Sequence, residues 1–341
     1  MENTILVATA AITTVALMTT RRFLYNRGKK KDIEDVVNAL LRKKGLNVTP
    51  PGRKRLVVIA DFDRTLSRFR TKDGREGVAT HGVLENYAPL GAEYVAKANA
   101  LKEKYLPLEN AEHLSFDERK RICEEWWSRA HGLLLHYGIR RIDVQKAVAE
   151  ETRLELREGC EDFFKILIEN DIPLLIFSAG LADIIESYLA TRIFSVGYET
   201  KNTTTNIPSN IHVISNRMVF EGPGSGAKLV DFASETIHSC NKGTVALKSH
   251  SHLSAVLKGR DTVLLLGDSM GDVHMADSLE KSGKTTSTTK IGFLNSQIKE
   301  ALATYESLYD AVIVNDGTMD IPVMFLKRLL GGMQESTKKL N

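Results

Sequence analysis

The sequence contains little cysteine and proline, and these low contents exclude several classes of protein. Its three cysteines among 341 residues, Cys123, Cys160 and Cys240, are odd in number and widely spaced. They match neither a disulfide framework nor a set of zinc ligands, and we interpret them as structural thiols in a reducing compartment. Because 43% of the residues are hydrophobic, with only 24 glycines and 8 prolines, the chain is neither disordered nor collagen-like. Its length allows two domains, or one domain with a large insertion.

An excess of one charge is also absent from most of the chain. It has 46 basic and 43 acidic residues, but residues 1–31 contain six of the basic residues and one acidic residue. A protein that binds nucleic acid would carry its basic residues on one face of a folded domain. Because this surplus lies at one end of the sequence instead, we expect no nucleic-acid polymer as a partner.

The first thirty residues have the pattern of a membrane anchor. Residues 3–20 contain no charge, proline or glycine, and as a helix they would be about 27 Å long, enough for a thin bilayer. Phe23 and Tyr25 follow at interfacial depth, and the basic residues over 21–31 are typical of a cytosolic flank. A cleaved signal peptide fits less well, since the positive charge follows the apolar run; a moderately apolar terminal helix is the alternative. The sequence predicts an N-terminal apolar helix, membrane-associated through residues 3–20, and a cytoplasmic catalytic domain.

Short apolar runs alternate with helical patterns over most of the remaining sequence. The runs are typical of buried strands and lie at 56–60, 173–177 and 263–266, with weaker ones at 211–214, 291–293 and 311–314. Helical patterns lie at 32–52, 181–189, 244–247 and onward, 273–279 and 297–305. This alternation predicts the α/β class, with a doubly wound, mainly parallel sheet.

One interval of about a hundred residues interrupts the alternation. Between the strands at 56–60 and 173–177 the periodicity is mainly helical, as at 101–105, 116–137 and 144–150. Such a length exceeds a crossover helix, so we predict an inserted helical cap. The predicted domains are a core of residues 53–70 and 171–341 and a cap of residues 71–170. Two polar stretches, 201–210 and 281–289, are predicted to be surface loops.

Acidic residues follow the first predicted strand. Asp61 and Asp63 come directly after residues 56–60, and strand alternation places them on one side, opposite Phe62. Two carboxylates held close repel each other, and a hard cation such as Mg²⁺ relieves the repulsion. A carboxylate can also attack phosphorus to form an aspartyl-phosphate. The alternative is a turn in which Asp63 and Thr65 cap the next helix.

A hydroxyl and a lysine lie at two other edges of predicted elements. Ser178 follows the strand at 173–177 and precedes a helix, so it could hold a phosphate or simply cap that helix. Lys242 opens a predicted helix and offers a charge to a phosphate. It could equally be a surface lysine, and on sequence alone Lys228 and Lys248 are rivals.

Two more acids, Asp268 and Asp272, follow the strand at 263–266. Carboxylates at the end of a buried strand are costly unless a cation or several donors compensate for them. In open α/β sheets, ligands bind beyond the carboxyl ends of the strands. Together the four segments supply a nucleophile, an acid and base, phosphate-binding groups and a metal site, a combination typical of phosphoryl transfer.

This combination resembles the haloacid dehalogenase (HAD) superfamily, and more closely the cytosolic 5′-nucleotidase III (pyrimidine 5′-nucleotidase) family, over about residues 57 to 330. The matching segments are ADFDRTLSRF at 60–69, KEKY at 102–105, HGLL at 131–134, FSAG at 177–180, NK at 241–242 and GDSMGD at 267–272. Because they lie in both core and cap, the resemblance is specific to the family. It implies a HAD-like core and a Mg²⁺-dependent 5′-nucleotidase.

The resemblance also implies roles for the acids. Asp61 would be the nucleophile and a metal ligand. Asp63 would protonate the leaving nucleoside, activate water for the second step and lend its backbone carbonyl to Mg²⁺. Asp268 would complete the metal site, and Asp272 would support it.

Substrate binding is implied in the same way. Ser178, the Ala179 amide and Lys242 would hold the phosphate, which favours Lys242 over its two rivals. Glu109 matches the acid that reads the nucleobase, since a carboxylate can accept from an exocyclic amino group. Members act on pyrimidine monophosphates such as CMP and UMP, some on 7-methylguanosine monophosphate, and some transfer the phosphate to another nucleoside. Ala130 stands where the family has serine, so the preferred base stays open.

The cap contains two adjacent tryptophans, and two other functions are compatible with parts of the sequence. Trp126 and Trp127 could stack on a base, although buried packing accounts for at least one of them. A phosphoacceptor or scaffold without enzymatic activity would use similar groups, but receiver domains are about a third of this length. A superfamily phosphatase acting on a sugar phosphate or phosphoserine is the other alternative, against which Glu109 argues. The sequence leaves the oligomeric state open.

Overall fold

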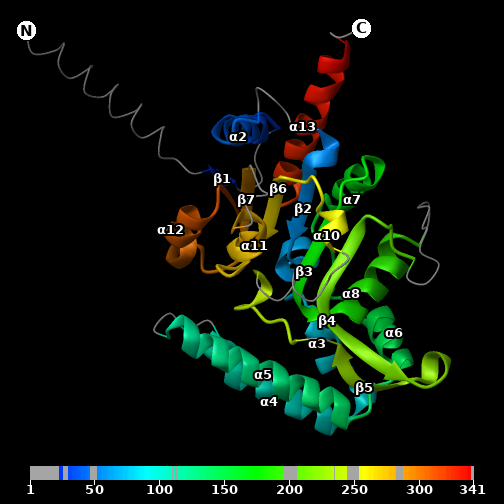
Figure 1. Ribbon diagram of the computed structural model, residues 1–341. Helices are drawn as coiled ribbons and strands as arrows, with labels where there is room; N and C mark the ends of the chain where they lie inside the picture. The colour runs from blue at the N-terminus through cyan, green and yellow to red at the C-terminus, as the bar shows by residue number, and fades with distance from the viewer. Residues whose placement is uncertain are drawn as a thin grey trace, which may run out of the picture.

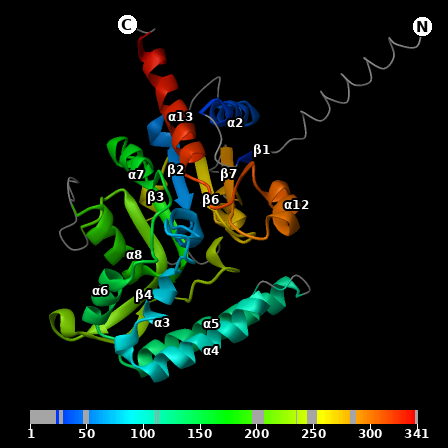
Figure 2. The same cartoon turned by 180° about the vertical axis from the view of Figure 1, so that it is seen from behind.

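The computed structural model describes residues 23–25, 30–46, 52–109, 111, 114–195, 206–233, 235–243, 253–281 and 287–338. Figure 1 shows a central sheet with helices on both faces and, at one end, a pair of long helices, α4 (Ala92–Glu109) and α5 (Phe116–His136). The view from behind in Figure 2 places this pair in the same position, at the opposite end from the C-terminal helix α13 (Asp320–Lys338).

The sheet has eight strands in the order β1-β8-β7-β6-β2-β3-β4-β5. Neighbouring strands are parallel, except that β4 and β5 are antiparallel. The strands are β1 (Phe23–Tyr25), β2 (Leu56–Ala60), β3 (Leu174–Leu181), β4 (Ile211–Glu221), β5 (Lys228–Ala233), β6 (Thr262–Gly267), β7 (Ser287–Leu294) and β8 (Ala311–Val314). The central position therefore belongs to β2, with β6 on one side and β3 on the other.

Alternate residues of β2 enter two different hydrophobic clusters, one on each face of the sheet. Val58 and Ala60 face one cluster, while Val57 and Ile59 face the other. The first face is covered by α2 (Lys30–Lys43), α6 (Arg141–Glu150), α7 (Cys160–Glu169), α8 (Ala182–Tyr188) and α13, and the second by α10 (Leu253–Val256), α11 (Asp277–Lys281) and α12 (Ile298–Leu308). A strand buried on both faces explains the unbroken apolar run at 56–60.

The predicted N-terminal apolar helix has to be corrected. The structure's first described element is instead the strand β1, which pairs with β8, so the chain at Phe23 and Tyr25 belongs to the sheet rather than to a membrane interface. Residues 3–20 lie outside the described residues. Within the described ranges, no helix has the length and apolar character needed to cross a membrane. We therefore remove the membrane helix from the fold class, together with the membrane association and anchoring inferred from it.

Other predicted elements differ in their bounds. The strand β3 continues through Ser178 to Leu181, and α8 begins only at Ala182. The predicted loop at 281–289 includes the first residues of β7, and β5 was not predicted. The predicted helix at 273–279 contains a short 3₁₀ turn, and α11 begins only at Asp277. The predicted helix at 244–247 lies outside the described residues.

The helices between β2 and β3 pack in two ways. The long helices α4 and α5 contact each other around Tyr105, Trp126 and Ala130, which form a separate small cluster. By contrast, α6 contacts α8, and α7 contacts α13. A short helix, α3 (Thr80–Glu85), contacts both α4 and β3. The domain boundaries at residues 70 and 170 remain a prediction. Within the predicted cap, α4 and α5 pack mainly against each other and form a separate helix pair.

Candidate active site

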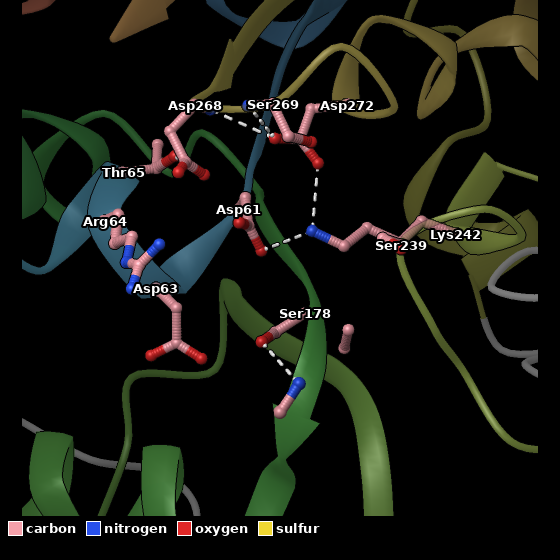
Figure 3. A network of polar contacts seen from close by, with 12 residues as sticks. Asp61, Asp63, Arg64, Thr65, Ser178, Ser239, Lys242, Asp268, Ser269 and Asp272 are labelled. Atoms are coloured by element: carbon pink, nitrogen blue, oxygen red, sulfur yellow. Dashed lines mark hydrogen bonds and ion pairs between the residues drawn. The ribbon is translucent and has the colours of Figure 1, made fainter. Parts of the chain in front are cut away.

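The site lies where β2, β3 and β6 end side by side. Because these strands are parallel neighbours, their carboxyl ends meet at one edge of the sheet. Asp61 follows β2, Asp268 follows β6, and Ser178 lies in the last half of β3. Figure 3 shows these side chains around a common centre, with Lys242 entering from the opposite side.

Lys242 joins two of the acids. Its Nζ lies 2.9 Å from Asp61 Oδ1 and 2.9 Å from Asp272 Oδ1. All three side chains are buried, with at most 6% of each exposed. Burial alone would lower the pKa of Lys242, but the Asp272 and Asp61 carboxylates outweigh it and raise this pKa. The lysine therefore stays charged and balances part of the acidic cluster.

The turn after β6 is held by the second of its acids. Asp272 Oδ2 accepts hydrogen bonds from the backbone N–H groups of Asp268, at 3.0 Å, and Ser269, at 2.9 Å. Thr65 donates its hydroxyl to Asp268 Oδ1 at 3.2 Å. The hydroxyl of Tyr309 donates to the Ser269 carbonyl at 2.6 Å. These contacts fix Asp268 beside Asp61 without using its second carboxylate oxygen.

The residues present fit a divalent cation. Asp61, Asp268 and Asp272 each offer a carboxylate oxygen, and these oxygens lie within 4.8 Å of one another. With Lys242 charged, the four side chains carry two net negative charges when the acids are ionised. Burial raises the pKa of Asp61 well above its usual range, with Lys242 opposing, and burial followed by Asp272 raises the pKa of Asp268 to about 6. A hard cation would relieve this cost, because oxygen ligands suit Mg²⁺.

Asp63 points away from this cluster in Figure 3 and is held by α3. Thr80 donates to it twice, from the backbone N–H at 2.8 Å and from the hydroxyl at 2.7 Å. Burial raises the pKa of Asp63, while the two Thr80 contacts lower it. Gly180 makes room for the pair, because a Cβ there would lie 1.8 Å from Thr80 Oγ1 and 3.0 Å from Asp63 Oδ2.

The last residues of β3, from Ser178 to Leu181, bring polar groups close to Asp63 and to the helix pair. Ser178 is 1% exposed, and its Oγ accepts from the Gly180 N–H at 3.0 Å. The Ala179 carbonyl accepts from Trp127 Nε1 and from Asn216 Nδ2, both at 2.8 Å. Trp127 belongs to α5, so its indole hydrogen bond joins the helix pair to the sheet.

A cavity of about 290 Å³ lies between the sheet edge and the helix pair and is lined by Asp61, Asp63, Glu109, Trp127, Ala130, Lys242 and Asp268, among others. This volume is close to the lower end of the range for small-molecule sites, about 300–1,000 Å³. Glu109, the last residue of α4, accepts a hydrogen bond from the Ser239 hydroxyl at 2.6 Å, and burial raises its pKa. The predicted nucleobase reader thus lies in the same cavity as the predicted nucleophile.

Of the three candidate lysines, the structure places Lys242 in the site. Lys228 is exposed at the start of β5, and Lys248 lies outside the described residues. Trp126 is 8% exposed and stacks on Tyr105 at 6.1 Å between ring centroids, which confirms that at least one of the two tryptophans is packed in the interior; both also line the cavity.

Thr80, Ser239 and the contact of Trp127 with the Ala179 carbonyl were not predicted from the sequence. No sequence motif marks Thr80, which is the first residue of α3, a helix whose bounds were not predicted. Ser239 lies three residues before the predicted phosphate-binding lysine, and that proximity was the available signal.

This cluster of buried carboxylates and one lysine lies at the carboxyl edge of the parallel sheet in a HAD-like α/β fold. Residues 64–330 match the family described as pyrimidine 5′-nucleotidase (UMPH-1). The 7-methylguanosine phosphate-specific 5′-nucleotidase of Homo sapiens is 34% identical over 299 residues, which cover 87% of this chain and 90% of that protein. The putative cytosolic 5′-nucleotidase 3 of Caenorhabditis elegans is 34% identical over 273 residues, which cover 79% of this chain and 68% of that protein.

A solved structure gives the same result. The crystal structure of cytosolic 5′-nucleotidase IIIB bound to cytidine has a TM-score of 0.72 to this chain at 26% sequence identity, covering 89% of this chain and 92% of that one. The chain therefore belongs to the pyrimidine 5′-nucleotidase (UMPH-1) family. It is a 5′-nucleotidase, a phosphoric monoester hydrolase, and the predicted family and enzyme class are confirmed.

Proposed function

We propose that the enzyme hydrolyses nucleoside 5′-monophosphates to nucleoside and phosphate through an aspartyl-phosphate on Asp61, with Mg²⁺ as its cofactor. The observation that carries this proposal is the buried cluster in which the Lys242 ammonium lies 2.9 Å from both Asp61 and Asp272, and in which oxygens of Asp61, Asp268 and Asp272 lie within 4.8 Å of one another. The family and its relatives suggest pyrimidine monophosphates such as CMP and UMP, and 7-methylguanosine monophosphate, as substrates.

In the first step, a carboxylate oxygen of Asp61 attacks the phosphorus, and the bond from phosphorus to the 5′ oxygen of the nucleoside breaks. Asp63 donates a proton to that leaving oxygen, a role that its raised pKa supports. In the second step, Asp63 takes a proton from water, which attacks the phosphorus and releases phosphate and free Asp61. Another nucleoside in place of water would give phosphotransfer instead.

The remaining groups bind rather than react. Ser178, the Ala179 amide and Lys242 hold the phosphate, and Glu109 contacts the nucleobase. Asp61, the Asp63 carbonyl and Asp268 would hold Mg²⁺, with Asp272 supporting them; when bound, Mg²⁺ would offset the charge of the phosphoryl oxygens. A charged lysine beside Asp61 also lowers the repulsion between this carboxylate and the phosphate.

The test is phosphate release from CMP, UMP, 7-methylguanosine monophosphate, a sugar phosphate and phosphoserine, with and without Mg²⁺. We expect release from nucleotides only, and only with the metal. Asp61→Asn should abolish it, whereas Asp117→Asn, at an exposed position in the first turn of α5, should keep it. Activity that persists in Asp61→Asn contradicts the mechanism, and preference for phosphoserine or the sugar phosphate contradicts the substrate class.

A further inference from the structure

Two of the three cysteines meet where α5 contacts the sheet edge. Cys123 lies in α5, Cys240 lies two residues before Lys242, and their sulfurs are 4.0 Å apart. Cys123 is fully buried, whereas Cys240 is partly exposed. The structural role expected from the sequence therefore describes Cys160, a buried thiol whose Sγ lies 3.3 Å from the Leu66 carbonyl, better than it describes this pair.

The pair is interlocked with the nucleobase end of the cavity. Cys123 Sγ lies 3.4 Å from Ser239 Oγ and 3.8 Å from Glu109 Oε1, and the Ser239 hydroxyl donates to the same Glu109 oxygen at 2.6 Å. The contact therefore connects both long helices to the segment that carries Lys242. Any covalent bond formed here would join the helix pair to the core beside the substrate.

We propose that Cys240 and Cys123 form a two-electron oxidation site, in which a hydroperoxide converts them to a disulfide that joins α5 to the segment preceding Lys242. Cys240 is the attacking residue because it is the more exposed of the two residues, and Cys123 is the resolving residue because its sulfur lies 4.0 Å away. The contact with Cys123, at 4.0 Å between the sulfurs, lowers the pKa of Cys240 and favours its thiolate.

The chemistry balances with hydrogen peroxide as the oxidant. The Cys240 thiolate takes one oxygen as the O–O bond breaks, giving a sulfenic acid and hydroxide, which is protonated to water. The Cys123 sulfur then attacks the Cys240 sulfur, the S–O bond breaks, and the departing hydroxide takes the Cys123 proton as a second water. Two thiols lose two electrons in total, and one peroxide becomes two waters.

Closing the bond would change the geometry of the site. The sulfurs must approach from 4.0 Å to about 2.05 Å, which moves the two cysteine side chains and pulls on the segments at Ser239 to Lys242 and in the middle of α5 that carry them. A displacement of about 1 Å in a positioned group can cost roughly a hundredfold in rate. We expect the disulfide to lower nucleotide hydrolysis roughly tenfold or more and a thiol reductant to restore it; this effect rests on the proposed function, whereas the disulfide itself does not.

The experiment treats the reduced full-length chain with graded hydrogen peroxide, blocks free thiols with N-ethylmaleimide and identifies linked peptides by mass spectrometry without reduction. We expect a Cys123–Cys240 link, with Cys160 still blocked by maleimide. Cys123→Ser and Cys240→Ser should each form no link and lose the reversible drop in hydrolysis. Cys160→Ser is the matched control and should behave like the wild type.

Two results would overturn the site. One is the absence of the linked peptide at peroxide concentrations that oxidise Cys240. The other is stoichiometric zinc in the purified protein that protects both sulfurs, because one ring nitrogen of His238 also lies within 4.8 Å of them. A disulfide without loss of hydrolysis would overturn only its effect on the enzyme. A reduced protein without nucleotidase activity would overturn the proposed function and leave the disulfide result standing.

Discussion

Thr80 controls both the position and the protonation of Asp63. Its hydroxyl and its backbone N–H donate to the two oxygens of one carboxylate, and both contacts lower the pKa that burial raises. Thr80→Val removes the hydroxyl and keeps the shape. A hydrogen bond to a charged group contributes about 1.5–3 kcal/mol, so we expect roughly tenfold or greater loss of kcat, with the alkaline limb of the pH profile shifted to higher pH.

A second buried threonine provides the matched control for this substitution. Thr289 is 1% exposed, and its hydroxyl has no hydrogen-bond partner among the described residues. Thr289→Val should therefore leave kcat and the pH profile unchanged. If Thr80→Val lowered kcat without moving the pH profile, Thr80 would only shape the site and not set the protonation of Asp63.

His131 makes the stability of the fold depend on pH. It is 5% exposed and lies between the rings of Phe232 and His81, at 3.9 and 5.9 Å between centroids. Burial first, and then the charge of His81, lower its pKa to about 3. Since the unfolded chain binds a proton near pH 6.5 and the folded chain does not, stability falls as the pH falls from about 7 toward 3.

Between pH 7 and 5 this linkage amounts to about 2 kcal/mol for a histidine with an unfolded pKa near 6.5. Urea unfolding at pH 7 and at pH 5 should show a smaller change in the free energy of unfolding for His131→Phe than for the wild type. This substitution keeps the stacked ring and removes the titrating group. Equal pH dependence in the two proteins would contradict the assignment to His131.

Part of the site could be predicted from single residues, for a topological reason. Asp61 and Asp268 directly follow strands, and parallel neighbours end at the same edge, so their meeting follows from the strand pattern. Thr80 and Ser239 could not be predicted in this way. Their partners Asp63 and Glu109 are 17 and 130 residues away, and those contacts depend on how separate elements pack.

At the scale of elements, the contact between β3 and α3 depends on the absence of one methyl group. Gly180→Ala would place a Cβ 1.8 Å from Thr80 Oγ1, so the start of α3 must move away from β3. Overpacking of this kind costs about 1–3 kcal/mol. We expect that loss of stability in urea unfolding, and a larger loss in phosphate release because Asp63 moves with Thr80.

Gly132 offers the opposite case within α5. A Cβ there meets no atom within 4 Å. At an exposed position inside a helix, alanine is more stable than glycine by about 0.5–1 kcal/mol. Gly132→Ala should therefore raise stability by about that amount and leave hydrolysis unchanged. If both glycine variants lost activity equally, the close approach at Gly180 would not be what holds Asp63.

Elements buried on both faces were the most predictable. The apolar runs at 56–60 and 311–314 have the same bounds as β2 and β8, because every side chain of these strands is buried. The strand β5 was missed, since its side chains are mostly half-buried or exposed and carry no continuous apolar run. The start of β7 was predicted as a loop because its first three residues are polar, although they pair with β6.

At the scale of the whole molecule, the segment that contains β1 and α2 belongs to the core. Six hydrophobic residues from this segment are buried in the first cluster: Ile33, Val36, Val37, Leu40, Leu41 and Leu46. In addition, Lys43 and Lys44 each lie 2.7 Å from an oxygen of Asp310, just before β8. The basic residues before position 32 were predicted to flank a membrane segment, whereas β1 in this region completes one edge of the sheet.

Deleting residues 1–46 should therefore unfold the domain rather than merely release it from a surface. Burying an aliphatic side chain contributes about 1.5–3 kcal/mol, so six of them approach the whole stability of a typical domain, about 5–15 kcal/mol. Circular dichroism and urea unfolding should show loss of the cooperative transition. Deleting only residues 1–22 leaves β1 and α2 in place and should keep both the transition and hydrolysis. A stable, active protein lacking residues 1–46 would show that α2 is dispensable to the core. Leu40→Ala is a milder change within α2, and it should lower the free energy of unfolding by about 2–5 kcal/mol.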